Sequence, residues 1–431
     1  MVSGDVQNPL HAVKTSSVVP AAVTGETAVH ELTNMDLAMK LHYLRTVYYY
    51  NKEAFDGLDI LSIKRPMFRW LDFYSTVAGR IRRSDAGRPF IKCNDSGVRI
   101  IEGRCNETLD EWLDKKEWDL HKHLVPSQVI GPEMLFSPLA VLQFTWFRCG
   151  GVAIGFSWSH ALGDVFSALR FIDTWAHIMA GTPPTQSINP PRSTVEKPIK
   201  PPNPPTKQLP AKPVEPVGDH WLTANNCKMD TFLFHITDTQ LKHIQSKISG
   251  QIPPFEALSA LIWRSLAKMR EGKEPKIVTI CRTDPRGKEN VWLSNDQIIS
   301  TVEADLDVKD AELSELAALI AKGGVDVSKE IEVMVDSNSG SPDLIVYGVN
   351  LTFVDLEQVN FFEMEFKGQK PILVQFKIDG VGDEGAVLVV RDHASGGDDK
   401  CGSGGWMVTV ILPDNEVMQL KSELEREWCI T

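Results

Sequence analysis

The pattern of apolar and polar positions is most informative between residues 147 and 179. Val152 to Trp158 is a short, mostly apolar run between a glycine pair and a polar turn, which is typical of a buried strand. Beyond Asp164, apolar residues recur at roughly helical spacing, and aspartate caps helices well because its carboxylate accepts free backbone N–H groups. The pattern predicts a strand, a tight turn and a helix, with His160 in the turn and Asp164 at its end.

The N-terminal part of the chain predicts helices followed by short strands. A capping signal at 32–36 precedes apolar positions that favour an amphipathic helix ending in the tyrosine cluster at 48–50. A second helical stretch is predicted over 58–78, divided at Pro66 because proline removes a backbone donor and disturbs the preceding turn. Short strands are expected at 89–93 and 98–101.

Proline is concentrated between residues 181 and 219, where 12 of the 26 prolines of the chain fall. Because proline removes backbone donors and favours extended polyproline geometry, this segment is predicted to be a linker that crosses the surface. A chain of 431 residues is long for one core, and two domains are the default expectation. We therefore expect an N-terminal domain over 1–180, a crossover over 181–219 and a C-terminal domain over 220–431.

Beyond the linker, strands and helices are predicted to alternate. Strands are expected at 231–236, 277–282, 344–353, 372–376, 386–391 and 407–412. Helices are expected at 238–249, from 255 onward, at 312–320 and at 416–428. The glycines of 395–405 lack the strand–loop–helix setting of a phosphate-binding loop, so this segment is predicted to be a hairpin turn.

The composition is that of an ordinary folded protein, with 42% hydrophobic and 24% charged residues. A formal net charge of −12 argues against a general nucleic-acid binder, whose affinity would rest on clustered Lys and Arg. An anionic ligand such as a coenzyme A ester would then need a local basic site. The candidates are a solvated turn with Arg80, Arg82, Arg83 and Arg88, and a helix end, or an anion site, with Lys268, Arg270, Lys273 and Lys276.

The cysteines and the lengths of the apolar runs indicate the cellular compartment and argue against certain kinds of site. The seven cysteines are odd in number and never in C-x-x-C spacing, so neither a disulfide framework nor a zinc site is expected, and a reducing compartment fits. His121 and His123 have metal-like spacing but no third ligand nearby, so no metal is expected. Neither a signal peptide nor a membrane span is expected, because no apolar run approaches the length of either.

His160 offers one clear chemical hypothesis. Its pKa lies near neutrality in water, so a neutral imidazole held in a cleft can take a proton from a hydroxyl or amine that attacks an activated acyl group. Asp164 either orients the imidazole or holds the turn through a salt bridge and a helix cap. The spacing alone fits a structural histidine and a simple N-cap equally well. A serine hydrolase is disfavoured because Ser159 stands where a nucleophile elbow needs glycine.

Several segments in order match a known family: 32–36, 78–80, 149–151, the His160-x-x-x-Asp164 motif, 255–263 and 404–408. Together they resemble the plant BAHD acyltransferases, which use acyl-CoA donors. The resemblance implies an α/β fold of the chloramphenicol acetyltransferase-like type. It would have two domains, each a mixed β-sheet with flanking helices, joined by a long crossover. A channel would run between the domains with His160 at its midpoint.

The resemblance also implies roles for three residues. The histidine deprotonates an acceptor hydroxyl or amine, which attacks the thioester of an acyl-CoA substrate, with no bound cofactor. The aspartate is mainly structural and pairs with an arginine, and Arg282 lies where that arginine is expected. A buried Asp164–Arg282 pair would hold the turn, so loss of Asp164 is expected to lower stability.

The chain departs from the family pattern at two places. Val165 follows the aspartate where the family usually has glycine. The family's Asp-Phe-Gly-Trp-Gly-Lys-Pro segment corresponds to residues 365–371, where only Phe366, Lys370 and Pro371 match. That loop supports the domain architecture and the coenzyme A side in the family, so its divergence argues against ordinary transferase activity.

The same departures, with segments 16–20, 35–43, 93–97, 160–168 and 347–353, resemble the Eceriferum/Glossy branch of wax-biosynthesis proteins. This resemblance implies a role in cuticular wax formation, in which members help the fatty acid elongase at the endoplasmic reticulum extend very-long-chain acyl-CoAs. They act with a β-ketoacyl-CoA synthase, and ordinary acyl transfer is not their expected mode of action.

Three hypotheses follow for the function. The first is an elongase accessory protein, monomeric apart from its β-ketoacyl-CoA synthase partner and peripheral on the cytosolic face of the endoplasmic reticulum. The second is a catalytic acyltransferase with His160 as general base, which esterifies or amidates a long-chain acyl-CoA product. The third is an interaction protein whose channel holds no ligand. The cytosol is the alternative location.

Overall fold

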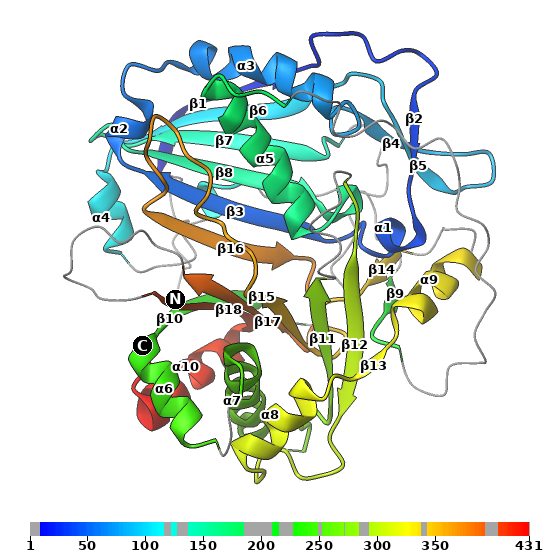
Figure 1. Ribbon diagram of the computed structural model, residues 1–431, viewed down its shortest axis with the longest axis vertical. Helices are drawn as coiled ribbons and strands as arrows, with labels where there is room; N and C mark the ends of the chain where they lie inside the picture. Colours follow the sequence, from blue (N-terminus) through cyan, green and yellow to red (C-terminus); the bar gives the residue numbers. More distant parts are fainter. Residues whose placement is uncertain are drawn as a thin grey trace, which may run out of the picture.

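The computed structural model of the protein describes residues 9–115, 122–126, 137–184, 209–214, 227–248, 252–270, 272–283, 293–337, 343–392 and 404–430. The strands of these segments form two large mixed sheets and two small ones, and helices cover one face of each large sheet (Figure 1). The two large sheets therefore organise the molecule.

The first large sheet has six strands. In spatial order they are β1 (Leu10–Val18), β6 (Val98–Cys105), β7 (Ala140–Trp146), β8 (Val152–Ser159), β3 (Tyr43–Tyr50) and β16 (Leu373–Asp379). Only β6 and β7 run parallel. Helices α3 (Ile60–Phe73) and α5 (Val165–Met179) cover one face, and Trp70, Phe171 and Trp175 pack together between them. This face carries the main core of the N-terminal half.

The second large sheet has seven strands. They are β10 (Met229–Thr237), β18 (Gly405–Pro413), β17 (Ala386–Asp392), β15 (Leu351–Leu356), β11 (Ile277–Thr283), β12 (Gln297–Glu303) and β13 (Val325–Asp326). The pairs β11–β15 and β15–β17 are parallel. The helices beside this sheet are α6 (Asp238–Ser246), α7 (Pro254–Met269), α8 (Leu313–Ala321) and α10 (Asp414–Trp428). Its buried face has a core of its own, centred on Trp263 of α7.

Smaller elements complete the described chain. One small sheet holds β2 (Val29–Glu31), β5 (Pro89–Lys92) and β4 (Arg80–Arg83), and another holds β14 (Asp343–Ile345) and β9 (Lys212–Val214). The short helices are α1 (Asn34–Ala38), α2 (Lys52–Phe55), α4 (Leu109–Leu113), α9 (Ser328–Ser337) and the 3-10 turn η2 (His160–Leu162). Most of the proline-rich segment lies outside the described residues.

The path of β16 departs from the simple division into domains at 181–219. This strand comes from residues 373–379, yet it pairs with β3 over its whole length and forms an edge of the first sheet. The C-terminal half of the chain therefore completes the N-terminal sheet. The part of the linker at 212–214 is held by the C-terminal half, because β9 pairs with β14.

The tyrosine cluster at 48–50 was predicted to end a helix, and this prediction is wrong. The capping box of Thr33 and Asp36 is present, but α1 ends at Ala38 and the tyrosines belong to β3. All eight residues of β3 are buried, because the strand lies between β8 and β16 and both of its faces are covered. A strand buried on both faces need not alternate between apolar and polar residues, so its sequence pattern alone does not distinguish it from a buried helix.

Two other predicted boundaries also differ. Helix α3 continues through Pro66 rather than dividing there. The predicted strand over 344–353 is interrupted by a turn in which Gly348 has a φ of 81°, so it forms two strands in different sheets. A side chain at Gly348 would contact the backbone of Gly382 at 2.5 Å, and this close approach explains why glycine stands there.

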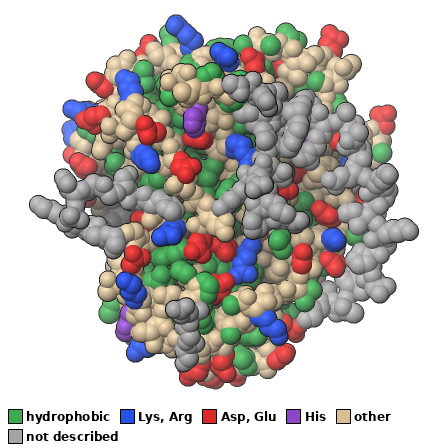
Figure 2. Space-filling model, in the orientation of Figure 1, with side chains coloured by type: hydrophobic (Ala, Val, Ile, Leu, Met, Phe, Trp, Pro, Cys, Tyr) green, Lys and Arg blue, Asp and Glu red, His purple; other side chains and the backbone are tan. Residues whose placement is uncertain are grey.

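Acidic and basic side chains are interspersed over the face of the molecule shown in Figure 2 rather than gathered into one field. On the described part of this face, the charges therefore do not form a broad basic surface. Among the described segments, no helix combines the length and the apolarity that crossing a membrane requires.

Candidate functional site

The strand, turn and helix predicted around His160 are confirmed. Strand β8 is buried along its whole length and leads into η2, and α5 begins at Val165. Gly163 separates turn and helix with a φ of 145°, and a β-carbon there would lie 2.9 Å from the backbone oxygen of Ser294. The turn is therefore pressed against the segment that precedes β12, and it holds His160 in the interior.

Asp164 serves as the N-cap of α5. Its Oδ1 accepts the backbone N–H of Ser167 at 3.0 Å, and its own N–H donates to the backbone oxygen of Ser294 at 2.9 Å. The side chain is buried, and burial raises the pKa of Asp164 to about 6. The carboxylate thus fixes the start of the helix and carries a substantial desolvation cost.

The predicted Asp164–Arg282 ion pair does not form. The Arg282 Nη2 atom contacts Glu256 Oε1 at 2.6 Å and its Nε contacts Asp355 Oδ2 at 3.3 Å. The guanidinium also lies over the ring of Phe255, 5.2 Å from its centroid. These contacts fasten β11 to α7 and β15 instead of holding the turn. The resemblance located Arg282 near the site correctly, but its partners are different.

His160 is held from both its ring and its backbone. Its Nε2 lies 3.0 Å from the hydroxyl of Tyr347, and its backbone oxygen accepts from Asn295 Nδ2 at 2.9 Å. The same amide group of Asn295 donates to Asp36 of α1. Only 1% of the His160 surface is exposed, and burial lowers the pKa of its imidazole to about 4. The imidazole is therefore neutral at neutral pH.

The hydroxyl of Tyr347 lies between His160 and Gln297. It is 3.0 Å from His160 Nε2, and it donates to Gln297 Oε1 at 3.0 Å. Nε2 is therefore already engaged by a group of the protein, and an acceptor substrate would have to displace the tyrosine hydroxyl to reach it.

The cavity around His160 is small. It measures about 20 Å³, and Asp164, Arg282, Tyr347 and Phe376 are among its lining residues. One water molecule needs roughly 10–15 Å³ by this type of measurement, so the space holds about one water and no acyl acceptor. The three predicted site residues are thus brought to one cavity, in which the histidine is closed off.

Sequence reasoning missed two other members of the site. His42 accepts the backbone N–H of Val346 through Nε2 at 3.0 Å, and its ring packs edge-on against Tyr347 with centroids 4.8 Å apart. Burial lowers the pKa of His42 to about 3. Gln297 was not singled out either. His42 lay in segment 35–43 of the family resemblance, which gave it no role, and Gln297 lay in none of the matching segments.

The predicted cationic sites are occupied by internal partners. Arg270 pairs with Glu384 at 2.8 Å and with Glu416 at 2.7 Å, and Lys268 pairs with Glu427 at 3.2 Å. These pairs fasten α10 and the segment before β17 to α7. The guanidinium of Arg270 is therefore engaged within the protein, which argues against an anion site at this helix end. Arg80 is buried and donates to the backbone oxygen of Gly97, which makes it structural.

No metal site emerges at the other candidate cluster. His121 lies outside the described residues, while Lys122 and His123 lie within them. Over the described ranges, no three His, Cys, Asp or Glu side chains are grouped closely enough to hold a metal ion.

The divergent segment at 365–371 keeps its structural contacts. Phe366 is buried, and its ring packs against Tyr50 of β3, Phe55 of α2 and Trp175 of α5. A tight turn follows, in which Lys367 and Gly368 both have positive φ values. The retained phenylalanine therefore anchors this loop to the N-terminal half, although positions 365 and 367–369 differ from the family motif.

Solved structures with the same architecture define the class of this fold. Vinorine synthase matches with a TM-score of 0.69 at 17% identity, over 96% of this chain and 97% of that chain. TRI101 of F. graminearum, solved with coenzyme A and T-2 mycotoxin, matches with a TM-score of 0.70 at 14% identity, over 93% and 98%. At these identities the comparison establishes the fold alone: the two-domain α/β fold of BAHD-type acyltransferases.

Sequence comparisons add the family. The model of the transferase family matches residues 9–427. Protein ECERIFERUM 26 of Arabidopsis thaliana is 37% identical over 430 residues, which cover 98% of this chain and 97% of that protein. Protein ECERIFERUM 2 of the same plant is 37% identical over 432 residues, covering 97% and 98%. The chain belongs to the BAHD-type transferase family, and it is similar along its full length to these ECERIFERUM proteins.

Proposed function

We propose that the protein acts in the elongation of very-long-chain acyl-CoAs for cuticular wax. It serves as an accessory to a β-ketoacyl-CoA synthase, and His160 transfers no acyl group in this role. The full-length similarity to ECERIFERUM proteins supports the wax assignment. The divergence of residues 365–371 from the family motif supports a departure from ordinary transfer.

The closure of His160 is the observation that carries this proposal. Its Nε2 is bonded to the hydroxyl of Tyr347 in a cavity of about 20 Å³, and its pKa of about 4 reflects full burial. A transferase needs an acceptor within about 3 Å of this nitrogen. The Tyr347 hydroxyl and the small volume of the cavity oppose this requirement, whereas a helper that presents a folded surface to the synthase does not have it.

The ligand and location follow from this role. Acyl-CoA is the expected ligand, and TRI101, which shares the fold, was solved with coenzyme A. The protein would associate with the cytosolic face of the endoplasmic reticulum through the synthase, as a monomer apart from that partner. The expected length of the acyl chain is set by the synthase and its helper together.

The alternative is an acyl-CoA-dependent acyltransferase, in which His160 accepts the proton of a hydroxyl or amine. One observation favours it: His160 and Asp164 are both retained and line the same cavity. For transfer to occur, Tyr347 would have to leave its bond with Nε2 to admit the acceptor. The transferase hypothesis therefore requires a conformational change that the accessory hypothesis does not.

Co-expression in yeast with a β-ketoacyl-CoA synthase tests the two functions directly. Acyl-chain profiles are compared for the synthase alone, with the wild-type protein and with His160→Ala. We expect the wild type and His160→Ala to lengthen the chains to the same extent. His243→Ala, on helix α6, is a control for expression and handling.

Loss of a general base typically lowers a rate by ~100- to 10,000-fold. If His160→Ala abolished chain lengthening in folded protein, or if purified wild-type protein formed an ester or amide from acyl-CoA at enzymatic rates that this variant lost, the accessory role would be wrong and the transferase role would replace it.

A further inference from the structure

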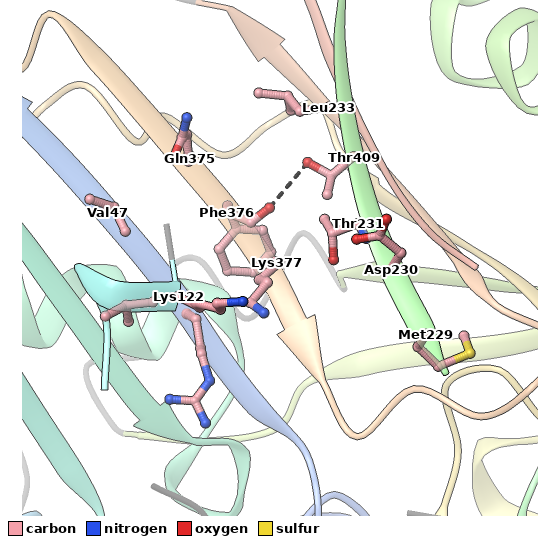
Figure 3. Close-up of a pocket in the computed structure, with 12 residues that line it drawn as sticks. Val47, Lys122, Met229, Asp230, Thr231, Leu233, Gln375, Phe376, Lys377 and Thr409 are labelled. Atoms are coloured by element: carbon pink, nitrogen blue, oxygen red, sulfur yellow. Dashed lines mark hydrogen bonds between the residues drawn. The ribbon is translucent and has the colours of Figure 1, made fainter. Parts of the chain in front are cut away.

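A second cavity lies between the two large sheets, on the face of β3 opposite to His160. Leu44 lines the histidine cavity, whereas Arg45 and Val47 line the second one. Successive residues of a strand point to opposite faces, so the sheet itself separates the two spaces. The second cavity measures about 130 Å³ and is bounded by β3, β16, β10 and β18 (Figure 3). Phe376 lines both cavities and lies at their boundary.

Two buried hydrogen-bond donors in the wall of this cavity lack partners. Arg45 is 2% exposed; its Nε pairs with Asp379 and its Nη1 donates to Ser157, but its Nη2 contacts no acceptor in the described chain. Gln375 is 8% exposed; its Oε1 accepts from Tyr49, and its Nε2 is without an acceptor in the same described segments. Buried donors are nearly always satisfied, so two of them beside one cavity point to an acceptor ligand.

The guanidinium of Arg45 favours an anionic acceptor. Lys122 and Lys377 line the cavity together with Arg45, and Asp230 faces them from β10 (Figure 3). Asp379 lies behind the wall, where burial opposes its ionisation but Arg45 and Lys377 still lower its pKa to about 2, so it is fully charged. The Nη2 atom of Arg45 remains without an acceptor in the described chain, and a hydrogen bond from a guanidinium to a carboxylate is stronger than one to a neutral oxygen.

The rest of the wall is apolar and sets the size of the ligand. The apolar lining residues are Val47, Val125, Met229, Leu233 and Phe376. A cavity of roughly 150 Å³ accommodates benzene, which has six non-hydrogen atoms. Butanoate also has six, so a carboxylate on a short alkyl stem matches the measured volume of about 130 Å³.

We propose that this cavity binds a small aliphatic carboxylate, independently of the histidine site. The carboxylate accepts hydrogen bonds from the free donors of Arg45 and Gln375, and its alkyl stem lies against the apolar wall. This binding site goes beyond the proposed elongation role and does not depend on it. It assigns a function to β16, the strand that the C-terminal half contributes to the first sheet.

Binding to the wild-type protein tests the proposal without any variant. Titration calorimetry or ligand-observed NMR is carried out with butanoate, butanamide and inorganic phosphate. We expect a dissociation constant on the order of 1 mM for butanoate, as befits so small a ligand. Butanamide should bind at least ~10-fold more weakly because it lacks the charge, and phosphate should also bind more weakly because it has no alkyl stem to place against the apolar wall. Equal affinity for butanamide, tighter binding of phosphate, or no binding of butanoate would each overturn the proposal.

Variants locate the site. Gln375→Glu places a carboxylate where the ligand's own would lie, and it should weaken butanoate binding by at least ~10-fold. Lys377→Met removes a cation from the wall, and it should weaken butanoate binding by at least ~3-fold. Lys242→Met, on the exposed side of α6, is the matched control and should bind butanoate like the wild type. Circular dichroism verifies folding. Wild-type affinity in folded Lys377→Met and Gln375→Glu proteins would show that butanoate binds elsewhere, which contradicts the assignment.

Discussion

The two cavities on either side of β3 and β16 differ in open volume and in the charge of their unpaired donors. Around His160, the imidazole, the Tyr347 hydroxyl and Gln297 Oε1 form one closed chain of hydrogen bonds in a space of about 20 Å³, and the unpaired Nε2 of Gln297 is neutral. In the second cavity, about 130 Å³ remain open, and its unpaired donors among the described residues include the charged guanidinium of Arg45. The residues expected to be catalytic thus lie in the more closely filled space.

This difference bears on how a retained motif is interpreted. The His160 and Asp164 positions match the family, yet the imidazole is bonded through Nε2 and the carboxylate caps a helix. The surroundings, rather than the two residues alone, determine whether a proton can move. The larger cavity, with the unpaired guanidinium nitrogen of Arg45, is the better candidate for a ligand site.

The largest expected effect comes from opening the closed cavity. Tyr347→Ala removes a fully buried ring beside His160, so we expect the free energy of unfolding to fall by ~3–5 kcal/mol. The same kind of truncation at the open cavity, Leu233→Ala, removes a partly buried side chain and should cost about 1 kcal/mol. Urea denaturation measures both. Similar losses for the two variants would show that the cavities do not differ in packing.

The pH dependence of stability should expose the burial of Asp164. Its folded pKa of about 6 lies above its ordinary 3.8, so the folded state holds a proton that the unfolded state has released. This contribution is fully present below pH 3.8 and is lost as pH rises to about 6, a change of about 3 kcal/mol by linkage. Asp164→Asn keeps an oxygen for the cap and has no proton to lose, so it should gain stability relative to wild type by this amount between pH 4 and 7.

The measurement is urea unfolding of both proteins across that range. Asp164→Ala, which loses the cap as well as the titrating carboxyl, should lie about 1 kcal/mol below Asp164→Asn at every pH. If Asp164→Asn were less stable than wild type at pH 7 but not at pH 4, the prediction would be wrong, and the result would support the ion pair expected from the sequence. The expectation that any loss of Asp164 lowers stability is thus replaced by one that depends on pH.

The local part of the site was predictable from sequence, and the reason is physical. A buried strand, a turn and a capped helix are specified by neighbouring residues, so β8, η2 and α5 were found where the pattern placed them. The tyrosines at 48–50 were assigned wrongly to a helix, because a strand buried on both faces does not alternate between apolar and polar residues. Helix or strand was undecidable there without knowledge of the neighbouring strands.

The tertiary part of the site could not be predicted in this way. His160, Gln297 and Tyr347 come from three distant segments, and no local pattern indicates that they form one hydrogen-bonded chain. The resemblance placed Arg282 near the site, but its choice of Glu256 and Asp355 depends on how α7 and β15 pack against β11. The second cavity was invisible for the same reason, since β16 reaches it only after crossing to the first sheet.

A smaller effect should follow from removing one atom of the closed chain. Tyr347→Phe leaves His160 Nε2 and Gln297 Oε1 buried without the hydroxyl between them, and we expect a loss of ~1–2 kcal/mol in the free energy of unfolding. In a His160→Ala background the same change should cost less, because one of the two partners is already gone. A double-mutant cycle by urea denaturation measures this coupling. Additive losses would mean that Tyr347 and His160 do not stabilise each other.

The smallest expected effect is a gain at the open cavity. Gln375→Glu keeps an acceptor for the Tyr49 hydroxyl and brings a carboxylate to the wall that also holds the free Nη2 of Arg45, so we expect stability to rise by about 1 kcal/mol at pH 7. Because pairing would depress the pKa of the new carboxyl, the gain should disappear as pH falls through that pKa. A loss of stability on Gln375→Glu would mean that the donors of the second cavity are not in need of an acceptor, and the contrast between the two cavities would fail.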